Sequence, residues 1–218
     1  LDEDKLLQSL HAGVFETPLW EDFLNRMRAK TGAEMVSMLY RPLDQKLTIE
    51  RHSGTLSPAD MRERAAALGL SVPMNYDMMR PGRAYAQEEL LDRGQEADSA
   101  YYDQILRPAG MLNARAIRVT DPDGGDLWLA CGGGRNIGAS TGALLTALAP
   151  HLTVALRTYI ALERERFRSS VTGEVFNRLR IGWCTIDAKC RIVEATDNLE
   201  AMLSWGTMLR RGRYNRLM

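Results

Sequence analysis

Apolar residues recur at helical spacing between residues 140 and 170. Steps of three and four separate these positions, which are Leu145, Leu148, Leu152, Ala155, Tyr159 and Leu162. This spacing places one apolar stripe along one face of a helix. A stripe with a period near 3.5 residues buries either against an identical helix of a second chain or against the chain's own sheet. The pattern therefore predicts a long helix and leaves both partners open.

Pro150 divides this predicted helix. Proline has no backbone N–H and its ring clashes with the preceding turn, so the helix is expected to kink there or to restart. The part before Pro150 is expected to pack on the sheet of the first domain. The part after it is expected to pair across a dimer through Leu152, Ala155, Tyr159 and Leu162.

The residues before the long helix alternate between helical and extended patterns. Helices are predicted over 6–14, 17–31 and 98–106, and Ser57 is expected to cap a further helix that starts at Pro58. Strands are predicted over 35–40, over 46–51 with Leu47 and Ile49 on one side, and over 114–120 and 126–131. The last two strands flank Asp121-Pro122-Asp123-Gly124-Gly125, a composition typical of a hairpin turn. This order predicts an α+β fold, with an antiparallel sheet flanked by helices, better than a doubly wound sheet.

A second strand–turn–strand pattern follows the long helix. Strands are predicted over 182–187 and 191–196, and Asp197 is expected to cap a helix with Glu200 three residues later. The chain is therefore expected to have three parts, a sensor domain over 1–149, a connecting helix over 150–170 and a partial module over 171–218.

Composition and charge limit the partners of the chain. The 28 Lys and Arg residues balance the 28 Asp and Glu residues, so no global basic field attracts the chain to nucleic acid. No uninterrupted apolar run approaches the ~18 residues of a membrane span, and the first residues lack a signal-peptide pattern. Three cysteines without metal-ligand spacing fit a reducing compartment. We expect a cytoplasmic protein without a metal, a cofactor or a membrane partner.

Two features resemble catalytic sites but lack a necessary element. The segment 132–140 follows a strand and opens a helix, where a phosphate loop would lie, but Ala139 stands where such a loop needs lysine. Cys131 ends a strand, where a buried small hydrophobe is the usual role and a nucleophile the rarer one. No catalytic residue is predicted, and an enzyme centred on Cys131 or on this loop is the alternative.

The irregular segment between residues 70 and 91 is rich in Tyr and Met. A long ordered connection in a compact domain is usually functional, so this segment is predicted to cover a ligand pocket. The candidate ligand-binding residues are Tyr76, Met78, Arg80, Tyr85, Tyr101, Tyr102, Arg115 and Trp128. Core packing is the alternative for the aromatic residues, and a ligand-free protein-interaction module is the alternative for the domain.

Several motifs resemble the GAF-like amino-terminal region of LuxR-type transcription regulators. They are Pro18-Leu19-Trp20 with Phe23-Leu24, the strand after Thr31-Gly32-Ala33, Arg80-Pro81-Gly82-Arg83, Arg107-Pro108-Ala109-Gly110, and Leu148-Ala149-Pro150-His151-Leu152. Residues 182–205 resemble the start of a PAS domain. The resemblance implies a sensory region that is followed by a PAS-like segment. Together with the helical stripe and the predicted pocket, it favours a homodimer that binds a small molecule. It also implies that DNA is bound only through a carboxy-terminal helix-turn-helix domain that this chain does not contain.

Overall fold

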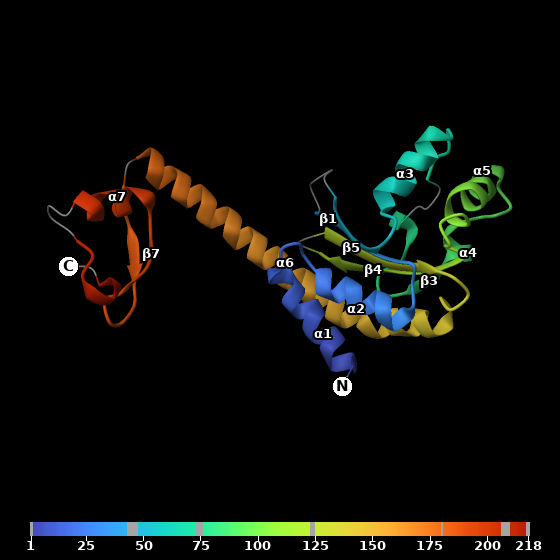
Figure 1. Cartoon of the computed structure of the whole chain (residues 1–218), viewed down its shortest axis with the longest axis horizontal. Coiled ribbons are helices and arrows are strands. Elements are labelled where there is room, and N and C mark those ends of the chain that lie inside the picture. The colour runs from blue at the N-terminus through green and yellow to red at the C-terminus, as the bar shows by residue number, and fades with distance from the viewer. Residues whose placement is uncertain are drawn as a thin grey trace. The chain divides into compact units, whose positions relative to one another are not determined.

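A five-stranded antiparallel sheet forms the centre of the first of two structural units. The strand order is β2–β1–β5–β4–β3, and every neighbouring pair is antiparallel. The strands are β1 (Met35–Pro42), β2 (Ile49–Gly54), β3 (Ala84–Ala86), β4 (Asn113–Asp121) and β5 (Gly125–Gly133). Figure 1 shows helices on both faces of this sheet. The predicted α+β fold is confirmed.

The computed structural model describes residues 2–42, 48–72, 76–122, 125–179, 181–205 and 210–216. The chain divides into two units, Leu1–Ile160 and Ala161–Met218. Helix α6 (Ala139–Arg178) contains the boundary between them. The predicted turn residues 123 and 124 lie outside the described residues.

Three helices cover one face of the sheet, which we call the core face. They are α1 (Asp2–Ala12), α2 (Glu21–Thr31) and the first part of α6. Alternate strand residues such as Met38, Ile117 and Leu129 point to this face and are fully buried. Burial of a large apolar side chain contributes about 1.5–3 kcal/mol, so the core face holds the main hydrophobic core of the unit.

Shorter elements cover the other face, which we call the cavity face. They are α3 (Pro58–Ala67), η2 (Tyr76–Met78), α4 (Gln87–Leu90), α5 (Glu96–Tyr101) and the π-helical turn η3 (Tyr102–Leu106). Figure 1 shows α3, α4 and α5 on the side of the sheet opposite α1 and α2. A separate hydrophobic cluster joins α3 to η3 through Met61, Ala65 and Ile105.

The apolar stripe of α6 packs on the core face of its own sheet. Leu152, Ala155 and Tyr159 are 0%, 1% and 4% exposed. The centre of the Tyr159 ring lies 5.3 Å from the ring centres of Trp20 and of Tyr40. Residues buried in this way are not available to a second chain. The predicted dimer contact is therefore wrong for these three residues. They pack on the chain's own sheet, which was the alternative.

Helix α6 does not restart at Pro150. It continues from Ala139 to Arg178 with Pro150 on its exposed side. The missing N–H deprives the carbonyl of Thr146 of its intrahelical donor. Thr146 is itself exposed, so water can satisfy that carbonyl and the helix tolerates the proline.

One segment of α6, Ala139–Ser169, is long and apolar enough to cross a membrane by length and composition. Its sequence contains no uninterrupted apolar run of this length, because threonine, proline and histidine separate its apolar residues. A core helix meets the same criterion, and 33% of the most apolar window is buried inside the structure. One such helix is weak evidence for a membrane span.

Two helix boundaries show how local signals compare with tertiary packing. Ser57 caps α3 as predicted, since its hydroxyl accepts from the Asp60 N–H at 3.0 Å and the Asp60 carboxylate accepts from the Ser57 N–H at 2.9 Å. The predicted start of the second helix near Thr17 is wrong, because α2 begins at Glu21. The Trp20 indole is buried and donates to the Leu10 carbonyl at 3.1 Å. This tertiary contact fixes where the chain enters the helix.

The second unit contains two short antiparallel strands and a helix. They are β6 (Cys184–Ile186), β7 (Ile192–Ala195) and α7 (Asp197–Trp205). Ile192, Leu199 and Leu203 form its small hydrophobic cluster. The order of two strands and a helix that starts at Asp197 agrees with the sequence pattern.

A candidate ligand-binding cavity

A cavity of ≈ 500 Å³ lies on the cavity face of the sheet. The centre of its floor consists of Ser37 on β1, Ala130 on β5 and Ala116 on β4. These residues are direct neighbours, because Ser37 pairs with Ala130 and Ala130 pairs with Ala116. Three adjacent small side chains leave a hollow where larger residues would fill the space. The register of the sheet therefore creates the cavity.

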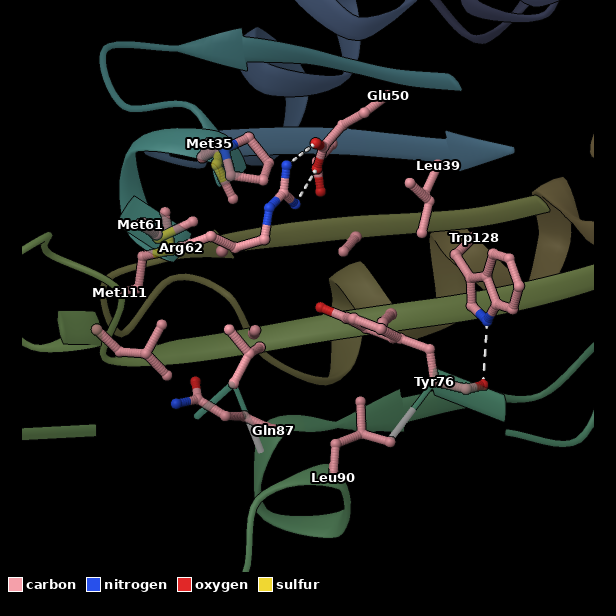
Figure 2. Close-up of a pocket in the computed structure, with 18 of the residues that line it drawn as sticks. Met35, Leu39, Glu50, Met61, Arg62, Tyr76, Gln87, Leu90, Met111 and Trp128 are labelled. Carbon is pink, nitrogen blue, oxygen red and sulfur yellow. Dashed lines mark hydrogen bonds and ion pairs between the residues drawn. The ribbon is translucent and has the colours of Figure 1, made fainter. Parts of the chain in front are cut away.

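Apolar side chains form most of the cavity wall. Met35, Met61, Met111 and Leu90 line it and surround the hollow in Figure 2. Methionine is unbranched and polarisable, so it adapts its shape to a bound group. The wall is suited to an apolar molecule.

Trp128 and the segment from Tyr76 to Met79 close one end of the cavity. The Trp128 indole N–H donates to the Tyr76 carbonyl at 3.1 Å (Figure 2). Arg118 donates to the carbonyls of Asp77 and Met79 at 2.9 and 3.1 Å. Arg41 adds an ion pair to the Asp77 carboxylate at 2.6 Å. These contacts hold the segment over the sheet.

Two tyrosines contribute hydroxyl groups to the lining. Burial raises the pKa of Tyr76 to about 12 and also raises the pKa of Tyr101. Both phenols therefore stay protonated at neutral pH. They offer O–H groups that can donate or accept hydrogen bonds.

The two charged residues of the lining that the structure describes form an ion pair. Arg62 on α3 donates to both carboxylate oxygens of Glu50 on β2, at 3.1 and 2.5 Å (Figure 2). This hydrogen bonding is the main cause that raises the pKa of Arg62. The pair contributes no net charge to the cavity.

Gln87 is a buried polar side chain of the lining, at 4% exposed. It follows strand β3 at the start of α4, where the Ala86 N–H donates to the Glu89 carboxylate at 3.0 Å. The Leu91 N–H donates to the Gln87 carbonyl at 2.9 Å, which fixes the backbone. Among the described residues, the side-chain oxygen Oε1 of Gln87 has no hydrogen-bond partner.

Tyr76, Tyr101 and Trp128 are the candidate ligand-binding residues that line the cavity. Tyr85 and Tyr102 are buried beside it in other contacts. The Tyr85 hydroxyl accepts from the Arg80 N–H at 2.9 Å, and the Arg93 guanidinium lies 4.1 Å from the Tyr102 ring centre. These two tyrosines serve the packing of the domain.

Met78, Arg80 and Arg115 do not line the cavity. Met78 is 76% exposed and Arg80 is also exposed. Arg115 pairs in register with Cys131, which belongs to the core face. Since successive strand residues point to opposite faces, the Arg115 side chain lies on the side of the sheet away from the cavity.

The candidates from sequence did not include Glu50, Arg62, Gln87 or the lining methionines Met35, Met61 and Met111. One signal was available for Glu50, because the predicted strand placed Leu47 and Ile49 on one face and hence Glu50 on the other. No comparable signal identified Gln87. Its position depends on the pairing of the three-residue strand β3 with β4.

Of the two features that suggested an enzyme, Cys131 lies away from the cavity, and Gly132 is the one residue of the segment 132–140 among the described residues that line it. Cys131 is fully buried on the core face, and burial raises the pKa of its thiol to about 12. In the glycine-rich loop, the Asn136 amide donates to the carbonyls of Thr31 and Gly32, both at 2.9 Å. This loop therefore caps α2. No cluster of metal-ligating side chains occurs among the described residues.

The fold and the cavity define an α+β domain with an internal space of small-molecule size. The chain matches no protein-family model and no curated protein sequence. Among solved structures, it is similar to the N-acylhomoserine lactone dependent LuxR-family transcription factor CepR2 from Burkholderia cenocepacia. The identity is 15% and the TM-score 0.47, over 72% of this chain and 94% of that chain.

Two further solved structures show a comparable likeness. One is the VqsR LBD domain from Pseudomonas aeruginosa, with 14% identity and a TM-score of 0.44 over 73% of this chain and 94% of that chain. The other is the GAF domain of the cyanobacteriochrome TePixJ, with 14% identity and a TM-score of 0.40 over 65% of this chain and 89% of that chain. Likeness at this level assigns neither a family nor a ligand.

Proposed function

We propose that the chain is the cytoplasmic sensory region of a bacterial transcription regulator and that its first unit binds a small molecule. The cavity is the observation that carries this proposal. Its volume of ≈ 500 Å³ lies within the range of about 300–1,000 Å³ typical of small-molecule sites. Its lining combines an apolar wall with a few polar groups, which is the usual composition of such sites.

The sheet offers a physical connection between the cavity and α6. Trp128 faces the cavity, while its neighbours Leu127 and Leu129 pack in the core that holds the first part of α6. A ligand that binds one arrangement of sheet and helix more tightly shifts the population toward that arrangement. In this proposal, α6 carries the change to the residues beyond Ile160.

The second unit fits the beginning of a PAS-like module in this proposal. The support is its order of two antiparallel strands followed by a helix. DNA is then contacted only by a helix-turn-helix domain outside this chain, in agreement with the equal numbers of acidic and basic residues.

We propose a homodimer in which α6 contributes residues after Ile160. Leu162 is half-buried and Phe167 is 72% exposed. Light scattering at high micromolar concentration should give twice the chain mass, and Leu162→Glu with Phe167→Glu should give the monomer mass. A monomer for the unsubstituted protein would contradict the dimer without affecting the cavity.

A thermal-shift screen against a metabolite library tests ligand binding. A compound that binds only the folded state stabilises it by RT ln(1 + [L]/Kd), about 2.7 kcal/mol at a hundredfold excess over Kd. At least one compound should raise the melting temperature of the protein. The same compound should have no effect on Ala130→Phe, which fills the hollow in the floor. A library without any stabilising compound would favour a ligand-free interaction module.

A further inference from the structure

We infer that the cavity selects a neutral, largely apolar molecule that donates an N–H or O–H hydrogen bond to the side-chain oxygen of Gln87. This inference rests on the proposed function, since it names the ligand class of the same cavity. Three observations carry it: the unpartnered oxygen of Gln87, the neutral lining and the apolar floor between the polar groups.

The Gln87 oxygen lacks a donor that a ligand can supply. Buried polar atoms in folded proteins are nearly always hydrogen-bonded, and each exception needs an explanation. Gln87 is buried, lines the cavity and has no partner for Oε1 among the described residues. The carbonyl oxygen of an amide accepts and does not donate. The ligand group that completes this site is therefore a donor.

Among its described residues, the lining offers no free positive charge to an anion. Glu50 already holds both terminal nitrogens of Arg62, and Arg118 is held by Asp126 at 2.8 Å and by the carbonyls over the cavity end. A carboxylate placed in the cavity would lose its hydration without gaining an unpaired cation. It would also face the Glu50 carboxylate, so a neutral ligand is favoured.

The polar groups of the lining lie toward opposite edges of the sheet. Gln87 directly follows β3, the edge strand on one side, and Glu50 lies on β2, the edge strand on the other side. The floor between them belongs to β1, β5 and β4 and is mainly apolar. Figure 2 shows Gln87 and the Glu50–Arg62 pair on opposite sides of the hollow. A ligand with its donor at Gln87 then lays its apolar part across this floor.

Three matched probes test the ligand class by isothermal titration calorimetry. They are 4-phenylphenol, its methyl ether 4-methoxybiphenyl, and biphenyl-4-carboxylate at neutral pH. The phenol should bind about tenfold more tightly than the ether, because only the phenol satisfies the buried acceptor. The carboxylate should bind more weakly than both.

Gln87→Leu and Gln87→Met remove the acceptor and replace it with an apolar side chain of similar size. Both variants should bind the phenol and the ether equally. Each should also melt above the unsubstituted protein without ligand, by about 2–8 °C, because a buried unsatisfied oxygen is removed. This second readout detects a variant that does not fold.

The outcomes separate this inference from the proposed function. Equal binding of phenol and ether to the unsubstituted protein overturns the selection of a donor, and so does a preference that survives in both variants. Tightest binding of the carboxylate overturns the neutral ligand class. In each of these cases the cavity still binds small molecules. If no probe binds, the inference is overturned, and the thermal-shift screen alone then decides whether the cavity is a ligand site.

Discussion

Shortening Leu152 distinguishes the two readings of the α6 stripe. Leu152 is fully buried in the core of its own unit. Substitution of a buried leucine by alanine costs about 2–5 kcal/mol, because transfer energy is lost and a cavity remains. For a central value of about 3 kcal/mol, a chain of this size should melt about 6–12 °C lower.

The assay for Leu152→Ala is thermal unfolding at two protein concentrations. The loss should be the same at both concentrations, because the contact lies within one chain. Val154→Ala is the matched control on the same helix, since Val154 is 51% exposed and its substitution should change stability by under about 0.5 kcal/mol. A loss that appears only at low concentration, together with a shift toward monomer, would refute the packing of Leu152 on its own sheet.

Three further predictions concern titrating groups. The pKa of Asp77 is lowered mainly by its hydrogen bond from Arg41, so this pair stabilises the fold above the ordinary value of 3.8 and loses its effect as pH falls through the lowered pKa. Asp77→Asn should therefore melt slightly below the unsubstituted protein at pH 7, by under about 1 kcal/mol for an exposed pair, with a smaller difference near pH 3; a difference that grows in acid would contradict this sign. Cys131 is buried and should react with a thiol reagent only after unfolding, whereas Cys190 is exposed and should react at once. Loss of a fast-reacting thiol in Cys131→Ser would contradict this expectation. In an ultraviolet titration of native protein, Tyr76→Phe should remove a phenol that ionises near pH 12 and leave the phenols that ionise near pH 10 unchanged. Loss of a phenol that ionises near pH 10 would show that Tyr76 is not desolvated.

Periodicity predicted the elements of this fold because helices and strands repeat locally. Ser57 capped its helix as expected, and strands β4 and β5 formed the expected hairpin. Periodicity did not decide what α6 packs against, because a stripe such as Leu152–Tyr159 has the same spacing whether it meets a sheet or another chain. That choice depends on tertiary structure.

The cavity was harder to predict than the fold because it depends on the register of the sheet. Ser37, Ala116 and Ala130 lie on separate strands, and only their pairing makes them neighbours. Arg115 shows the same dependence, since it lies next to Ala116 in sequence but on the opposite face. Aromatic composition identified Trp128, whereas nothing in the local sequence distinguished Gln87.

Calorimetric titration with the first compound that raises the melting temperature tests the central claim most directly. The account predicts one binding site per chain in the unsubstituted protein and no binding to Ala130→Phe, with both proteins folded by circular dichroism. Equal binding to the two proteins would place the ligand elsewhere and contradict a function for this cavity.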